Sequence, residues 1–274
     1  MSTHPWSFTP ICHAKSIFSS KTGTPRQANI TPTSILILDL DECKDLNNPQ
    51  YSLDQLTEFS HLWVIFIFHQ NNGEARNRAD QPVSSLVKSK VAPPRLNGQK
   101  VGLFATRTPH RPNIIGLSLC KIDKVEGSKI FLSGCDLIDG TPILDVKPFI
   151  EEYDSPKLLK SSDENENIRQ PKWAEPEIFP DLKVEITSHA MQQLDKLTFG
   201  DSSIFKKQNE NFKTKFLNSV IEILKSDPRS VYRKNCTSDR LFYMTIDGIH
   251  VTAWFDDEVE GEVRCEILRF MVKQ

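Results

Sequence analysis

The sequence predicts a mainly β protein in which an N-terminal β-barrel precedes a smaller α+β domain. In the N-terminal half, short runs of Val, Ile, Leu and Phe alternate with turns roughly every 8 to 15 residues, the pattern of an antiparallel barrel. After residue 176, apolar residues recur at helical spacing before further strand-like runs. Prolines and an acidic-polar run separate the two patterns. We therefore predict a barrel domain at 1–158, a linker at 159–176 and a second domain at 177–274.

The strands expected in the barrel are short, β-branched runs bounded by turn residues. They lie at residues 34–40, 62–68, 100–106, 116–122, 130–138 and 143–150. The run LWVIFIF is apolar at every position, which favours a strand covered on both faces. The sequence DGTP forms a tight turn before the last run. In that run, strand alternation places Ile143, Asp145 and Lys147 on one face, which is either an ordinary solvated face or the polar wall of a pocket.

The second domain begins with helical periodicity and ends with a hairpin. A short helix is expected from Ser188 (SHAMQQLDKL), with Ser188 as its N-cap, and a longer one is expected at 209–225. Two alternating runs flank Asp247 and Gly248, a dipeptide typical of a two-residue β-turn. The expected strands are 240–246, 249–255 and 263–272.

The charge distribution limits how the chain could bind nucleic acid. A net charge of −2 over 274 residues excludes a polycation, so any such contact must come from a local patch. Residues 76–112 hold eight Lys and Arg and a single acid, an excess of positive charge that suits phosphate binding. The alternative is a solvated loop with scattered cations.

The cysteines predict neither a metal site nor a disulfide framework. All six lack Cys-x-x-Cys spacing, and three lie in apolar strand-like runs, which suits a reducing compartment. No apolar run approaches the ~20 residues of a membrane span, and MSTHPWSFTP lacks the apolar core of a secretion signal. We expect a cytoplasmic protein, with the nucleus as the second location, and neither a metal nor a membrane partner.

The loop at residues 107–113 combines stiffness with positive charge. Pro109 and Pro112 fix φ near −65°. The polar residues around them are Arg107, His110, Arg111 and Asn113. Planar guanidinium groups held in a fixed orientation suit the binding of a carboxylate or phosphate. The alternative is a stiff hairpin loop with solvated arginines.

Five blocks in order along the chain carry a family resemblance. They are KTGTPRQ (21–27), FSHLWVIFIFHQN (59–71), ATRTPHRPNIIGLSL (105–119), SGCDLIDGTPILDVKPFIEEYD (133–154) and DPRSVY (227–232). With them the chain resembles, over nearly its whole length, the TsaA-like family of tRNA methyltransferases. These enzymes use S-adenosylmethionine to methylate N6 of threonylcarbamoyladenosine beside the anticodon. The family usually has Arg-Pro-Asn-Pro-Ile-Gly in the third block, where this chain has Ile114 in place of the second proline.

The resemblance implies a TsaA-like β-barrel, tRNA as the partner and a homodimer with the cofactor near the subunit contact. The implied S-adenosylmethionine site consists of Arg26, Gln27, His69, Gln70, Arg107, Arg111, Asn113, Leu117, Asp136, Gly140 and Thr141. No Gly-x-Gly-x-x-Gly follows a strand, so the cofactor prediction depends on the resemblance.

Methylation of a carbamoylated adenine releases an acidic N6 proton, which a nearby carboxylate such as Asp139 or Asp145 could accept. RNA contacts are expected at Lys88, Lys90 and Arg95 of the basic stretch. They are also expected at Arg229 and Arg233 of the C-terminal domain, which we expect to bind tRNA. Arg229 and Arg233 could instead complement the negative C-terminal end of a helix dipole.

Two other functions compete with tRNA methylation. One is a non-catalytic RNA- or nucleotide-binding barrel, and the other is a hydrolase of small nucleotides, which lacks an evident nucleophile or metal cluster.

Overall fold

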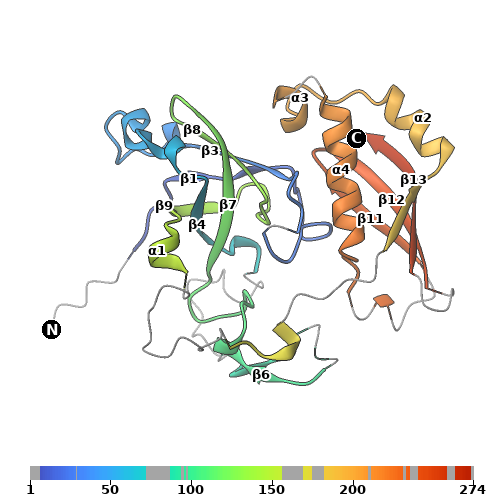
Figure 1. Cartoon of the computed structure of the whole chain (residues 1–274), viewed down its shortest axis with the longest axis horizontal. Helices are drawn as coiled ribbons and strands as arrows, with labels where there is room; N and C mark the ends of the chain where they lie inside the picture. The colour runs from blue at the N-terminus through green and yellow to red at the C-terminus, as the bar shows by residue number, and fades with distance from the viewer. Residues whose placement is uncertain are drawn as a thin grey trace, which may run out of the picture.

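Two parts of the chain lie side by side in the computed structural model (Figure 1). The structure describes residues 7–28, 30–71, 87–93, 96, 98–155, 169–174, 182–208, 211–230, 233–234, 240–257 and 263–272. Most of the predicted linker at 159–176 falls outside these ranges.

Seven antiparallel strands of the N-terminal part form one sheet in the order β1-β9-β4-β7-β8-β3-β2. They are β1 (Cys12–His13), β2 (Lys15–Ser16), β3 (Ile35–Asp39), β4 (His61–Ile67), β7 (Ile115–Glu126), β8 (Lys129–Ser133) and β9 (Pro142–Pro148). The edge strands β1 and β2 belong to one stretch of chain, interrupted only by Ala14. Because β1 pairs with β9 and β2 with β3, this stretch joins both edges of the sheet and closes a barrel. The predicted N-terminal β-barrel is confirmed.

β4 differs from expectation in exposure, and β7 and β8 differ in length, since β7 runs on to Glu126. β4 is not covered on both faces: Leu62, Val64 and Phe66 are buried, whereas the residues between them are partly exposed. β8 stops short of its predicted end, because Gly134 takes a left-handed φ of 70° and turns the chain.

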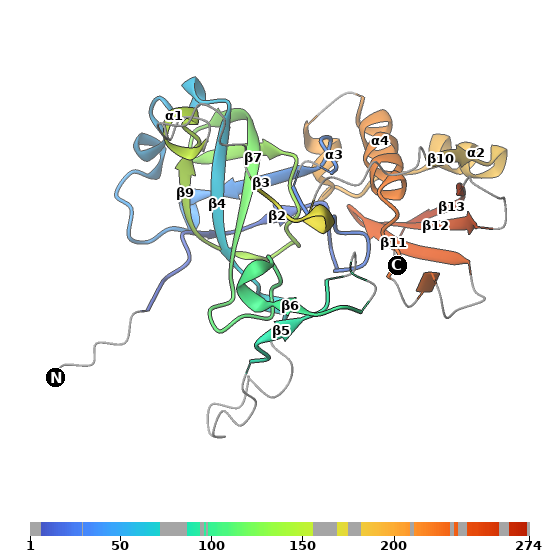
Figure 2. The same cartoon turned by 60° about the horizontal axis from the view of Figure 1, so that its bottom comes forward.

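The predicted strand at 100–106 is mostly wrong. Only β6 (Val101–Gly102) is extended, and a 3-10 turn follows at Leu103–Ala105. β6 pairs with β5 (Lys90–Val91) in a separate two-stranded sheet, which Figure 2 shows below the barrel. The 107–113 loop therefore leaves a short turn rather than the end of a barrel strand.

A β-bulge in β9 overturns the predicted face of Asp145. Phe66 pairs with Ile143 while the preceding Ile65 pairs with Asp145, so Leu144 is the extra residue. Ile143 points into the barrel and is fully buried, whereas Asp145 lies on the outer face beside Ile65. The prediction that Ile143 and Asp145 share one face is therefore wrong.

Inside the barrel, the inward face of β7 carries a buried polar residue, Ser118. Alternation along β7 turns Gly116, Ser118 and Cys120 inward, where all three are buried. Gly116 is required there, because a Cβ would overlap the ring of Phe66. Ser118 is then left among apolar neighbours and needs a hydrogen-bond partner.

The C-terminal part is a four-stranded sheet with helices packed over one face (Figure 2). In the order β10-β13-β12-β11, its strands are β10 (Lys183–Ile186), β13 (Arg264–Val272), β12 (Ile249–Asp256) and β11 (Leu241–Ile246). The α-helices in the described part of the chain are α1 (Glu151–Asp154), α2 (Ser188–Lys196), α3 (Ile204–Gln208) and α4 (Phe212–Lys225). The α+β prediction and its hairpin are confirmed, while β10, which runs parallel to β13, was not predicted.

The first helix of this part begins at Ser188 as predicted, but its N-cap lies one residue earlier than predicted. Thr187, not Ser188, is the N-cap of α2, because the Thr187 hydroxyl accepts a hydrogen bond from the Ala190 N–H at 3.0 Å.

One hydrophobic core runs through both parts of the molecule. The Asp247 N–H donates to the Ile17 carbonyl at 2.8 Å, and Phe18 forms a β-bridge with Ile246. The segment after β2 thus packs directly against the β11–β12 hairpin, and the two parts contribute to the same apolar interior.

Candidate functional site

A loop at residues 20–27 leaves β2 and reaches the base of the 107–113 loop. Lys21 Nζ donates to the Gln70 carbonyl at 2.8 Å, just beyond β4. At the other end, Arg107 Nη1 donates to Gln27 Oε1 at 3.1 Å. Three of the five sequence blocks thus meet here, and Arg26, Gln27 and Arg107 all lie at an exposed edge of the barrel.

Beneath this edge, Asp136 is the partner that Ser118 requires. Ser118 Oγ donates to Asp136 Oδ1 at 2.5 Å. Burial raises the pKa of Asp136. Hydrogen bonds from Ser118 and from the Ala28 N–H, together with the charge of Arg107, lower the pKa but do not cancel this rise. The structure therefore brings a largely buried carboxylate close to an exposed guanidinium and to the end of the 20–27 loop.

His69 lies near enough to Lys21 of this loop and to His13 of β1 for their charges to affect it. It starts the 3-10 turn after β4, and burial lowers its pKa, helped by the nearby charges of His13 and Lys21. The imidazole is therefore held neutral more firmly than an exposed one. A neutral ring can accept a hydrogen bond as well as donate one.

Arg111 braces the stiff loop. Its Nη1 donates to the Thr106 carbonyl at 2.8 Å, and its guanidinium lies 5.6 Å from the ring centroid of Phe104. Phe104 is itself 77% exposed, and Asn113 is exposed at the far end of the loop. Arg111 thus shapes the loop, whereas Arg107 faces the Gln27 side.

The turn at 139–141 packs against the stretch that closes the barrel. Asp139 Oδ1 accepts the Ser16 N–H at 2.9 Å. The Gly140 N–H donates to the Ala14 carbonyl at 2.8 Å, and Gly140 has a φ of 75°. Thr141 is buried and accepts the Ala14 N–H through its carbonyl at 2.9 Å. These contacts tie Asp139, Gly140 and Thr141 to the 12–16 stretch that closes the barrel and carries His13.

Comparison with known proteins decides the family. A family model described as the tRNA-methyltransferase O N-terminal domain matches residues 13–155. A tRNA (adenine(37)-N6)-methyltransferase of Rattus norvegicus is 30% identical over 94% of this chain and 88% of its own length. The chain belongs to the tRNA-methyltransferase O family. The protein of the same description from Escherichia coli K12 is 27% identical over 89% of this chain and 91% of its own. A solved structure of TrmO covers 98% of this chain and 99% of its own, with 25% identity and a TM-score of 0.62.

Two predicted site residues of this tRNA-methyltransferase O protein lie away from the Arg107 edge. Leu117, 53% exposed, pairs with Ile65 across β4 and β7 and points outward, opposite to Ser118. Asp145 lies on the same outer face, and its carboxylate is 2.8 Å from Lys147 Nζ. The structure does not bring the side chains of Leu117 and Asp145 together with Asp136.

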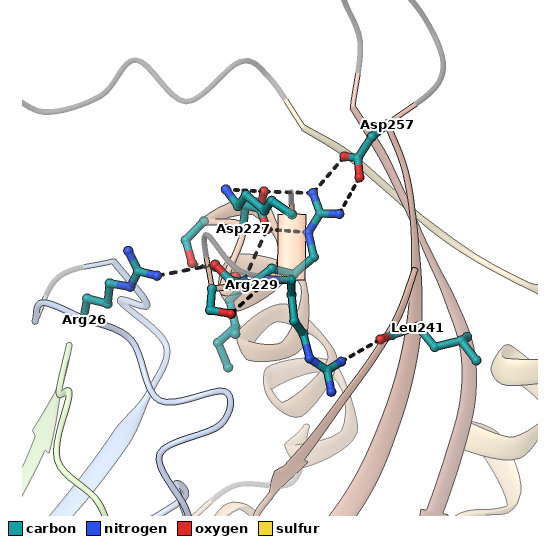
Figure 3. Close-up of polar contacts among 10 residues, drawn as sticks. Arg26, Asp227, Arg229, Leu241 and Asp257 are labelled. Atoms are coloured by element: carbon teal, nitrogen blue, oxygen red, sulfur yellow. Dashed lines mark hydrogen bonds and ion pairs between the residues drawn. The ribbon is translucent and has the colours of Figure 1, made fainter. Parts of the chain in front are cut away.

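Arg229, predicted to contact RNA, is buried in the C-terminal part (Figure 3). It is 6% exposed, and its guanidinium forks onto Asp257 at 2.6 and 2.8 Å and onto Asp227 at 2.9 and 3.0 Å. Its Cζ also lies 4.1 Å from the ring centroid of Phe255. A phosphate has no access to this guanidinium, so the expectation of an RNA contact at Arg229 does not agree with its placement.

The other predicted RNA contacts are distributed over two surfaces. Lys88 and Lys90 are exposed at β5, and Arg233 is exposed next to β11, where its Nη1 donates to the Leu241 carbonyl at 3.0 Å. Arg95 lies outside the described residues, as does Tyr232 of the DPRSVY block.

Several residues of this edge were not predicted from the sequence. They are His13, Lys21, Phe104 and Ser118. Ser118 had a recognisable signal, since it is the polar member of an inward-facing Gly-x-Ser-x-Cys alternation. Among the residues that the structure describes, no group of His, Cys, Asp and Glu could hold a metal ion, and no described helix is long and apolar enough to cross a bilayer.

Proposed function

We propose that this chain transfers a methyl group from S-adenosylmethionine to N6 of the adenosine beside the anticodon of tRNA, and that this adenosine carries a threonylcarbamoyl group. Family membership supports the tRNA and the adenine N6 position, because the relatives are tRNA (adenine(37)-N6)-methyltransferases. The threonylcarbamoyl group follows from the motif resemblance. The observation that carries the proposal is that the matched region contains the Arg107, Gln27 and Asp136 cluster.

The residues of this cluster suit the groups that S-adenosylmethionine presents, namely a carboxylate, an ammonium and a sulfonium. The guanidinium of Arg107, and that of Arg26 on the neighbouring loop, would hold the carboxylate. The Asp136 carboxylate would offset the positive charge of the ammonium or sulfonium. Gln27, Gln70 and His69 would supply neutral hydrogen-bond partners, and Arg111 and Asn113 belong to the loop that forms the rim.

When bound, S-adenosylmethionine supplies an electrophilic methyl group. Transfer forms the N6–C bond, breaks the S–C bond and releases one proton from N6. The contribution of the protein is chiefly positioning, since the two reacting atoms must be held in line. Of the two carboxylates considered as proton acceptor, we retain Asp139. It lies in an exposed turn, whereas Asp145 is paired with Lys147 on the outer face of the barrel.

The direct test is incubation of the chain with labelled S-adenosylmethionine and total tRNA, followed by nucleoside analysis. We expect label in N6-methylated threonylcarbamoyladenosine. Cofactor binding without methyl transfer would instead favour a non-catalytic nucleotide- or RNA-binding barrel.

Asp136→Asn should weaken S-adenosylmethionine binding about tenfold, as measured by calorimetry. The substitution keeps the shape of the side chain but removes the negative charge that attracts a cationic cofactor, and tenfold corresponds to about 1.4 kcal/mol. Ser118→Ala is the matched control, because it removes the 2.5 Å hydrogen bond and leaves the charge. Equal losses in both variants would show that the hydrogen bond, not the charge, matters.

Asp139→Asn should slow methyl transfer by about 100-fold with little change in cofactor affinity, the scale expected for loss of a general base. Asp145→Asn should stay near the wild-type rate, because its carboxylate is engaged by Lys147. Single-turnover methylation of tRNA measures both. Two wild-type rates would show that neither carboxylate accepts the proton.

The remaining parts of the proposal concern partners and location. We propose a homodimer with the cofactor near the subunit contact, as the resemblance implies, and analytical ultracentrifugation of the chain tests the dimer. We also propose that Lys88, Lys90 and Arg233 contact tRNA phosphates. Each contact should add roughly one unit to the slope of log binding constant against log salt concentration.

The reaction is proposed to take place in the cytoplasm, with the nucleus as the second location.

A further inference from the structure

The 20–27 loop rests on the C-terminal sheet as well as on the barrel. Gly23 has a φ of 90°, and a Cβ there would lie 2.8 Å from Met244 Cβ, so the loop backbone lies directly against β11. Three residues further on, Arg26 Nη2 donates to the Arg229 carbonyl at 3.4 Å (Figure 3). One loop therefore carries two predicted cofactor residues and touches the C-terminal part at two points.

The chain on both sides of the loop is held by the same part. Before it, the Ile17 carbonyl accepts the Asp247 N–H. After it, Thr33 Oγ1 donates to Glu222 Oε2 at 2.7 Å, and Glu222 Oε2 also accepts the Thr33 N–H at 3.1 Å. The loop is thus bracketed by contacts to the β11–β12 hairpin and to α4.

The Arg229 residue that Arg26 contacts is held by several charged groups. The Arg229 carbonyl belongs to a turn in which Asp227 has a φ of 42°, a conformation that costs a non-glycine residue free energy. Two carboxylates grip the Arg229 guanidinium in forks, and Phe255 lies against it. Lys234 Nζ adds a contact to Asp227 Oδ2 at 2.6 Å. Figure 3 shows Arg26 reaching the backbone of Arg229, the residue whose side chain is at the centre of this network.

We propose that Arg229 is a positioning residue for the S-adenosylmethionine site: its ion-pair network, together with Met244, holds the 20–27 loop in the conformation that presents Arg26 and Gln27. The C-terminal part then supports cofactor binding as well as tRNA binding, and the barrel alone is an incomplete cofactor-binding unit. This inference rests on the proposed function, because it assumes that Arg26 and Gln27 face the cofactor.

The test is Asp257→Asn in the full chain, which keeps the side-chain shape and weakens the fork on Arg229 without touching the loop. We expect the KM for S-adenosylmethionine to rise about tenfold, while kcat at saturating cofactor stays within about twofold. Amide hydrogen exchange should quicken in residues 20–27 and stay unchanged in β4 and β7. Asp201→Asn is the matched control, because it breaks an exposed pair with Lys206 in the same part of the molecule and should change none of these quantities.

A second variant, Met244→Ala, loosens the loop at Gly23 without altering any charge, and it should give the same KM increase and the same exchange pattern. Unchanged KM and unchanged exchange in both folded variants would overturn the inference. So would faster exchange with an unchanged KM, because the loop position would then not matter for the cofactor. Arg107→Ala separates this outcome from failure of the proposed site: if it weakens cofactor binding while Asp257→Asn and Met244→Ala do not, the site stands and the positioning role falls.

Discussion

Arg107→Ala is expected to weaken S-adenosylmethionine binding by about 1.5–3 kcal/mol, the scale of a hydrogen bond to a charged group, while the melting temperature stays almost unchanged. The exposed guanidinium bonds within the chain only to Gln27 among the contacts that the structure describes, so its removal leaves no buried group unsatisfied. A cofactor carboxylate would lose a planar, charged partner. Isothermal titration calorimetry on the folded variant measures the loss.

Two further variants sharpen that experiment. Arg111→Ala should also weaken binding, but through the loop, because Arg111 braces the Thr106 carbonyl and stacks on Phe104. Lys124→Ala is the control, since it removes a cation of β7 that is paired with Glu126 at 2.7 Å. Unaltered affinity in both arginine variants would mean that the cofactor binds elsewhere.

Arg229→Leu should lower the free energy of unfolding by about 3 kcal/mol. This is the lower end of the range for breaking a buried ion pair, because Asp257 is partly exposed. Leucine fills much of the space beside Phe255 but leaves Asp227 and Asp257 without their shared cation. Urea denaturation of the variant and the wild type measures the difference, and Arg229→Lys, which keeps the charge but not the fork, should recover part of it.

The loss in free energy of unfolding caused by Arg229→Leu should also become smaller as the pH falls. Burial alone would raise the pKa of Asp227, but the bonds and charges of Arg229 and Lys234 outweigh it, so the pKa lies below its ordinary value. The bond from Arg229 likewise lowers the pKa of Asp257. A carboxyl group whose pKa is lowered by folding stabilises the protein at pH values above its ordinary pKa. This stability is lost as the pH falls through the pKa of the folded state. The difference between variant and wild type should therefore shrink below about pH 4. A difference that stays constant down to the acid transition would contradict this explanation.

The elements that the sequence predicts well are those whose cause is local. The β11–β12 hairpin follows from Asp247 and Gly248, and both have the positive φ that this turn requires. The barrel follows from dense, β-branched runs. Arg107 and Gln27, which the resemblance assigned to one site, are in contact in the structure, while their role in cofactor binding stays a prediction.

The elements that it predicts poorly depend on a partner strand or a distant side chain. The face of Asp145 is set by a bulge against β4, and strand alternation cannot locate a bulge. The burial of Arg229 is set by Asp257, which lies beyond the hairpin and has no sequence pattern linking it to the turn. Asp136 was expected from its motif, but its bond to Ser118 depends on how β7 faces the interior.

The hydrogen bond between Asp247 and the Ile17 carbonyl has a consequence for synthesis of the chain. Ile17 and Phe18 leave the ribosome more than 200 residues before the hairpin that covers them is made. Contacts between residues so far apart in sequence form late and slow the folding reaction. The barrel should therefore stay incomplete, with these two apolar side chains accessible to chaperones, until the second sheet has been translated.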